Sequence, residues 1–193
     1  MPGDRILGAL QFLKEAERLK STLRSGYTST GRPESVAEHT WRLCLMALVL
    51  ADEFEGIDAL RLIKLCIVHD LGEALSGDIP AVMQTDGINK SARERADLEQ
   101  LTQALDPAKR MEVLSLWEEY EAAATSEAVL AKGLDKLETI LQHVQGQNPA
   151  DFDYAFNLGY GQKQTSAHPL LAEIRALLDK ETRARAEASG SDR

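Results

Sequence analysis

Two histidines and two aspartates, spread along the chain, form a possible metal-binding set. His39 is followed thirty residues later by the pair His69-Asp70, and Asp135 lies further along the sequence. Together they offer two imidazole nitrogens and two carboxylates. This mixture suits a borderline first-row divalent ion such as Mn, Fe, Co, Ni or Zn better than an ion that prefers only oxygen. The chemistry to consider is therefore that of a divalent metal.

Helical periodicity places both histidines on the apolar faces of expected helices. Taken alone, each histidine is better explained as a hydrogen-bonded core residue than as a metal ligand. Asp135 lies nearly opposite the apolar stripe of its own helix, which predicts a solvated side chain unless that face borders a cleft. Glu73 lies one helical turn after His69, at i+4, and adds a carboxylate to the same region.

The segments that carry these residues are expected to be helical almost throughout, which makes the fold all-α. Arg24–Pro33 is rich in Gly, Ser and Thr and is expected to be a loop. Ser35 and Glu38 have the form of a capping box, and Gly77–Pro80 is expected to end a helix. Helices are expected over residues 4–23, 35–54, 58–74, 89–105, 106–123, 126–145 and from 168 into a polar tail.

Length and charge limit the classes of function. At 193 residues the chain is expected to form one domain over residues 1–193, with a polar tail over about 186–193. The net charge of -9 argues against a protein that binds nucleic-acid polymers, because such binding relies on Lys and Arg. Cys44 and Cys66 lie in apolar runs and are expected to be thiols in a reducing compartment. Without a targeting segment or a membrane-spanning run, a cytoplasmic location is expected.

Four blocks of sequence carry a more specific resemblance. They are RPESVAEH (Arg32–His39), VHDLGEALSGDIP (Val68–Pro80), LWEEYEAAATSEA (Leu116–Ala128) and KGLDKLETILQ (Lys132–Gln142). Their order resembles the H…HD…D signature of the HD-domain metal-dependent phosphohydrolases, and within that family the bacterial and eukaryotic 5'-deoxynucleotidases. The similarity runs in register over about residues 10–180, the expected core of the domain.

This resemblance implies a compact HD-domain helical bundle with a single metal-centred cleft. One divalent ion (Mn, Co, Fe, Ni, Zn or Mg) would be held by four ligands, namely His39, His69, Asp70 and Asp135. By motif position, Glu73 and Asp78 correspond to the family's acid–base carboxylates. Phosphate-ester hydrolysis needs such groups to activate a water and to protonate the departing sugar oxygen. We expect Glu73 to act on the water and Asp78 on the leaving group.

The resemblance also implies substrate contacts. In similar enzymes an arginine of the loop before the first histidine helix meets the phosphate, and Arg24 fits this role, with Arg32 at the other end of the loop. Many relatives place a tryptophan against the sugar, whereas this chain has Tyr27. An acidic residue of LWEEYE is expected near the nucleoside, Glu121 in preference to Glu119. By contrast, His143 is expected on the solvent side of its helix and receives no function, as does His168.

These observations predict metal-dependent hydrolysis of (deoxy)ribonucleoside 5'-monophosphates to nucleoside and phosphate. The alternatives are an HD phosphohydrolase that acts on a nucleotide phosphodiester or triphosphate, and a non-catalytic HD module that binds nucleotide. The presence of both Glu73 and Asp78 argues against the non-catalytic module, because pure binding needs no acid–base pair. The resemblance further implies a homodimer.

Overall fold

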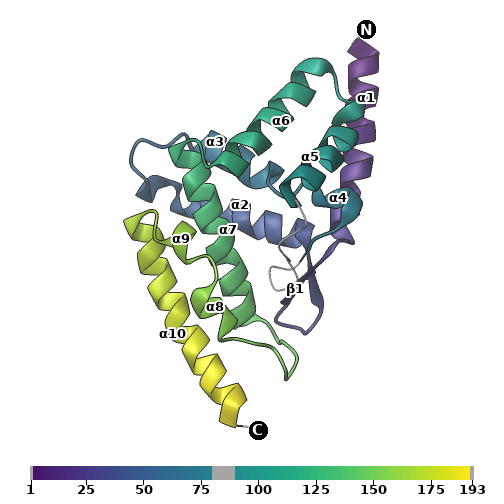
Figure 1. Ribbon diagram of the computed structural model, residues 1–193. Coiled ribbons are helices and arrows are strands. Elements are labelled where there is room, and N and C mark those ends of the chain that lie inside the picture. Colours follow the sequence, from purple (N-terminus) through teal and green to yellow (C-terminus); the bar gives the residue numbers. More distant parts are fainter. Residues whose placement is uncertain (1, 80–89, 192–193) are drawn as a thin grey trace.

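A long central helix organises the molecule. The computed structural model describes residues 2–79 and 90–191, and most of them are helical, as predicted. Helix α7 (Ser126–Gln145) packs against α2 (Val36–Leu50), α3 (Ala59–Val68), α6 (Pro107–Ala122) and α10 (Pro169–Ser191). Figure 1 shows α7 in the middle of the bundle, with α10 lying along its C-terminal half. Because α7 is covered by several elements, polar residues on more than one of its faces become buried.

The helix starts follow the capping signals of the sequence. The Ser35 hydroxyl accepts from the Glu38 amide while the Glu38 carboxylate accepts from the Ser35 amide, so the predicted capping box before α2 is confirmed. Asp58 caps α3 and Asp106 caps α6, where Pro107 is the first helical residue. Helix α7 has the predicted bounds.

The N-terminal part differs from the prediction in two ways. Helix α1 (Pro2–Ala16) is followed by the 3-10 turn η1 (Glu17–Lys20), so the first helix ends well before residue 23. The segment expected to be a loop forms an antiparallel ribbon, with β1 (Leu23–Tyr27) paired to β2 (Pro33–Ser35). The sequence did not predict this pairing, because the two short strands lack the apolar alternation that marks a half-buried strand and are separated by turn residues.

The third predicted helix is interrupted at the HD motif. Helix α3 ends at Val68, and a short helix α4 (Glu73–Ser76) follows after a turn, so the prediction of one helix over 58–74 is wrong. The reason is a close crossing by α5 (Lys90–Leu101): a Cβ atom added to Gly72 would lie 2.5 Å from the Glu94 carbonyl oxygen. This crossing is not visible in the local pattern, and it places His69 and Asp70 in the turn.

The remaining elements complete the bundle. The 3-10 turns η2 (Ala51–Glu53) and η4 (Thr102–Ala104) end the predicted helices over 35–54 and 89–105. The predicted helix start at Asn89 and the helix break at Pro80 fall outside the described residues. Two short helices, α8 (Phe156–Gly159) and α9 (Gln162–Thr165), lie where no element was predicted. Within the described ranges, no helix has the length and apolar character needed to cross a membrane.

Candidate metal centre

The Nε2 atoms of the two motif histidines face the same buried space. His39 lies on α2 and is fully buried, and His69 caps the end of α3 with 4% of its surface exposed. The Nδ1 atom of His39 donates to the Glu138 carboxylate, and that of His69 donates to the Cys66 carbonyl oxygen at 2.8 Å. Both Nε2 atoms are buried and have no hydrogen-bond partner among the residues that the structure describes. Each imidazole therefore points an unused lone pair into the same buried space.

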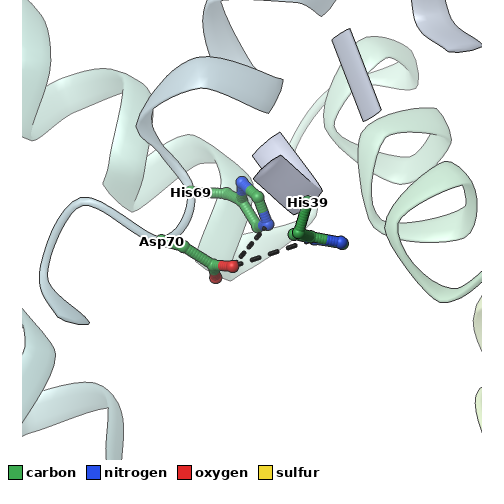
Figure 2. A group of neighbouring side chains, drawn as sticks. All are labelled: His39, His69 and Asp70. Carbon is green, nitrogen blue, oxygen red and sulfur yellow. Dashed lines mark ion pairs between the residues drawn. The ribbon is translucent and has the colours of Figure 1, made fainter. Parts of the chain in front are cut away.

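Two aspartate oxygens face these nitrogens. Asp70 Oδ2 lies 3.0 Å from His69 Nε2 and 3.8 Å from His39 Nε2, and dashed lines mark both pairs in Figure 2. Asp135 Oδ1 lies 3.2 Å from His39 Nε2 and 3.9 Å from His69 Nε2. Tetrahedral ligands at roughly 2.1 Å from a first-row ion are separated by about 3.4 Å. His39, His69 and Asp70 therefore form a set that could hold such an ion, and Asp135 faces both histidines of that set.

Asp135 is held so that one oxygen faces the cluster. Its other oxygen, Oδ2, accepts from the Tyr120 hydroxyl at 2.9 Å and from Lys136 Nζ at 2.9 Å. Burial and then the Asp135 charge raise the pKa of Tyr120, so the phenol remains a donor. Burial disfavours the Lys136 ammonium, but Asp135 and Tyr160 more than offset this and raise its pKa. Asp135 is only 4% exposed and lines a cavity. Its helix face therefore borders a cleft, and the alternative of a solvated side chain does not hold.

A buried carboxylate behind His39 was missed by the sequence analysis. Glu138 is fully buried and accepts from His39 Nδ1 with one oxygen and from Arg42 Nε, at 2.7 Å, with the other. Such a carboxylate fixes the ring orientation and tautomer of a metal-ligating histidine. A glutamate three residues after Asp135 within an apolar helix was the available signal. Glu34 adjoins the pair, and burial followed by the charge of Glu138 raises its pKa to about 7.

The aspartates of the cluster lie at one end of a cavity of about 900 Å³. Glu73 and Asp78 also line it. Glu73 is 1% exposed, and its Oε1 accepts from Lys90 Nζ at 3.3 Å, while its Oε2 has no hydrogen-bond partner within residues 2–79 and 90–191. Burial, followed by the charges of Asp70 and Asp78, raises the pKa of Glu73 to about 9. The cavity thus brings the predicted acid–base carboxylates to the predicted metal ligands.

Three cationic side chains line the same cavity: Arg24, Lys90 and Lys136. Arg24 extends from β1 and donates to Asp70 Oδ2 and to Thr139 Oγ1, both at 3.1 Å. Lys90 and Lys136 were not singled out by the sequence analysis. Each cation contacts a carboxylate of the site, so the positive charge of the cavity is held next to the cluster.

The structure does not bring every predicted substrate contact to the cavity. Tyr27 lines it, but Arg32 turns toward solvent and pairs with Glu38. Glu121 pairs with Lys132 at 3.2 Å and lies outside the cavity lining. Glu119 binds Arg61 instead. In LWEEYE it is the tyrosine between the two glutamates that reaches the cluster.

An aromatic wall at the other end of the cavity was not predicted. It consists of Phe152, Phe156 and Tyr160 and is supported by His143. The prediction that His143 faces solvent is wrong, because the segment after α7 folds back over it and leaves 6% of its surface exposed. Its Nδ1 atom bonds Asn157 Oδ1 at 2.9 Å, and its ring meets Phe152 edge-on. The close spacing of aromatic residues over 152–160 was the only signal in the sequence.

Comparison with known proteins agrees with this arrangement. The HD domain family model matches residues 16–175. The chain is 40% identical over 144 residues to the 5'-deoxynucleotidase HDDC2 of Bos taurus. The aligned region covers 74% of this chain and 69% of the bovine protein. It is 33% identical over 148 residues to the 5'-deoxynucleotidase hdd1 of Schizosaccharomyces pombe, with 74% of each covered.

A crystal structure shares almost the whole fold. It is that of a "predicted metal-dependent phosphohydrolase" from Magnetospirillum magnetotacticum MS-1, with a TM-score of 0.81, 29% identity and 95% of both chains covered. The matched region spans about two thirds of the length of the vertebrate relatives. The chain belongs to the HD domain family and is a metal-dependent phosphohydrolase, so the resemblance seen in the four blocks is confirmed.

Proposed function

We propose that this HD domain phosphohydrolase is a 5'-deoxynucleotidase that releases phosphate from deoxyribonucleoside 5'-monophosphates. The observation that carries the proposal is the meeting of two unpartnered, buried imidazole nitrogens with two aspartate oxygens at one end of a nucleotide-sized cavity. The relatives of this chain that are named 5'-deoxynucleotidases support the substrate class.

We assign His39, His69, Asp70 and Asp135 as ligands of one divalent ion. When bound, such an ion lowers the pKa of a coordinated water and offsets charge on phosphoryl oxygens. The two imidazoles contribute neutral nitrogen ligands, because their Nδ1 atoms are occupied as donors to protein oxygens. The two aspartates contribute one oxygen each.

The acid–base roles fall to the carboxylates beside this set. Glu73 is buried, and its raised pKa gives its ionised form the basicity needed to take a proton from water. Asp78 lines the cavity further along the chain and is assigned to protonate the departing 5' oxygen of the sugar. Lys90 lies against Glu73 and keeps its carboxylate oriented.

Two cations are assigned to the phosphate. Arg24 can present two N–H groups side by side, which matches phosphate oxygens. Lys136 approaches from α7, beside the opposite aspartate. We assign Tyr27, which lines the same cavity, to pack on the sugar.

The charge of the cavity favours a monophosphate. Six carboxylates (Asp70, Glu73, Asp78, Asp135, Asp151 and Asp153) and three cationic side chains line the part of the cavity that the structure describes. A divalent ion still leaves this surface slightly acidic when all six are ionised. A triphosphate, with its additional negative charges, would meet repulsion that a monophosphate avoids.

We also propose that the chain forms a homodimer. Helix α2 carries an exposed apolar row, with Trp41 67%, Leu48 60% and Val49 69% exposed. Such a row is typical of a surface that is covered by a protein partner. Light scattering after size exclusion would show twice the monomer mass, and a monomer at micromolar concentration would refute the assignment.

The function is tested by phosphate release from a panel of dAMP, AMP, dADP and dATP, repeated with Mn, Co, Mg and Zn and with a chelator. We expect dAMP to be hydrolysed fastest and the chelator to stop the reaction. Equal rates with AMP and dAMP would remove the deoxynucleotide preference. No release from any nucleotide with any metal would refute the enzymatic assignment.

A further inference from the structure

We propose that the aromatic wall formed by Phe152, Phe156 and Tyr160 is the subsite for the nucleobase, which stacks against the ring of Phe156. The proposal rests on the proposed function and extends it to the far end of the cavity. It assigns a ligand class, a planar heteroaromatic ring, to residues outside the metal and phosphate groups.

The order of side chains along the cavity matches the order of groups in a nucleotide. Lys136 Nζ lies 2.9 Å from Asp135 Oδ2 and 5.2 Å from the centre of the Tyr160 ring. The Tyr160 ring centre is in turn 5.6 Å from that of Phe156. The aromatic pair therefore begins one lysine side chain away from a proposed metal ligand. A phosphate at the cations would direct its sugar and base toward these rings.

Phe156 presents apolar surface that a ligand can cover. It is 37% exposed although it lines a cavity, whereas Tyr160 is partly buried. The two rings are tilted by 30° to one another, and their centres are 5.6 Å apart. A flat ring placed over Phe156 would remove apolar area from water and gain the stacking that aromatic pairs prefer.

The wall is fixed in position by the last helix. Arg175 on α10 is 5% exposed and donates to the carbonyl oxygens of Asn157, Leu158 and Tyr160 at 2.6–2.9 Å. Asp179 accepts from the same guanidinium at 2.5 Å. These contacts hold the backbone of α8 before any ligand arrives, and a pre-organised wall loses less entropy on binding.

A stacking subsite binds the flat face of the base and does not distinguish one base from another. Every base has a π-face, so a phenyl ring accepts all of them without recognising their edges. The wall should therefore increase the use of substrates that carry a base, with little difference between dAMP, dGMP, dCMP and dTMP.

The test compares dAMP with 2-deoxyribose 5-phosphate, which keeps the phosphate and sugar but lacks the base. Loss of one stacking partner typically corresponds to a factor of about 5–150 in binding, and Phe156→Ala should lie near the lower value because the ring is partly exposed. We expect kcat/KM for dAMP to fall about 5- to 10-fold, with kcat/KM for 2-deoxyribose 5-phosphate unchanged. Met111→Ala, which removes an exposed apolar side chain of α6 outside the cavity, is the control.

A second measurement does not depend on turnover. Deoxyadenosine binding to the chelator-treated protein is followed by calorimetry, and Phe156→Ala should weaken it by a similar factor. If both substrates lose activity equally, or if the variant binds deoxyadenosine as tightly as the wild type, the base subsite is wrong while the phosphohydrolase assignment stands. If deoxyadenosine binds through Phe156 but no phosphate is released from any nucleotide, the subsite stands and the proposed reaction fails.

Discussion

Substitution of Glu138 by glutamine tests the carboxylate behind His39. One oxygen of Glu138 accepts from His39 Nδ1 and the other accepts from Arg42 Nε at 2.7 Å. A glutamine has the same shape but offers only one acceptor oxygen, so its amide N–H₂ group must face one of the two donors. The variant therefore leaves a buried donor unpaired or rotates the imidazole away from the metal position.

The expected magnitude follows from both consequences. A buried donor without a partner costs about 1–3 kcal/mol. Loss of an outer carboxylate of this kind typically lowers metal affinity about 10- to 100-fold, which is equivalent to about 1.4–2.7 kcal/mol. The two estimates agree in size, and they predict that Glu138→Gln binds metal about 10- to 100-fold more weakly while retaining all four proposed ligands.

The assay is competition for Co²⁺ or Zn²⁺ between the purified protein and a chelator of known affinity, with circular dichroism to confirm that the variant folds. Glu119→Gln is the matched control, because it makes the same chemical change at a carboxylate that pairs with Arg61 away from the cavity. Unchanged metal affinity in a folded Glu138→Gln protein would refute the argument that Glu138 orients His39.

Three further substitutions test the remaining assignments. His69→Ala should lose bound metal, by elemental analysis, together with phosphatase activity, and full metal occupancy would refute its role as a ligand. Lys136→Met should lower kcat/KM for dAMP about 10-fold through loss of a charge-assisted contact, whereas Lys132→Met, one turn earlier on α7, should not. Because Glu73 keeps its proton up to about pH 9 only when folded, the stability this provides is complete below about pH 4.5 and is lost as the pH rises to about 9. The metal-free wild type should accordingly lose melting temperature over this range more steeply than Glu73→Gln, and parallel profiles would contradict the assignment.

The sequence predicted those parts of the fold that depend on neighbouring residues. The cap at Ser35 and the Asp106-Pro107 start are local signals, and both helices begin where these signals lie. The bounds of α7 were also predicted, because apolar residues repeat along its whole length. The end of α3 was missed because it depends on the crossing at Gly72, where α5 approaches from a later part of the chain.

The same distinction applies to the site. Motif blocks identified the histidines and aspartates, since these recur at fixed places in similar sequences. They assigned the phosphate to Arg24 but also placed Arg32 at the site, whereas in the structure Arg24 meets Asp70 and Arg32 pairs with Glu38 outside the cavity. The aromatic wall depends on Arg175, a buried arginine whose hydrogen bonds join α10 to the segment before it. No local pattern predicts such a contact.

The pairing of charges in the cavity links metal binding to phosphate binding. In the structure Arg24 contacts Asp70, and Lys136 contacts Asp135, so each cation assigned to phosphate is already paired with an aspartate assigned to the metal. A divalent cation held by the aspartates would offset their negative charge and would weaken their attraction for Arg24 and Lys136. Arg24 and Lys136 can accordingly turn their N–H groups to a phosphate without leaving an unpaired carboxylate in a largely buried site. We therefore expect metal to bind before nucleotide, and nucleotide affinity to fall when the metal is removed.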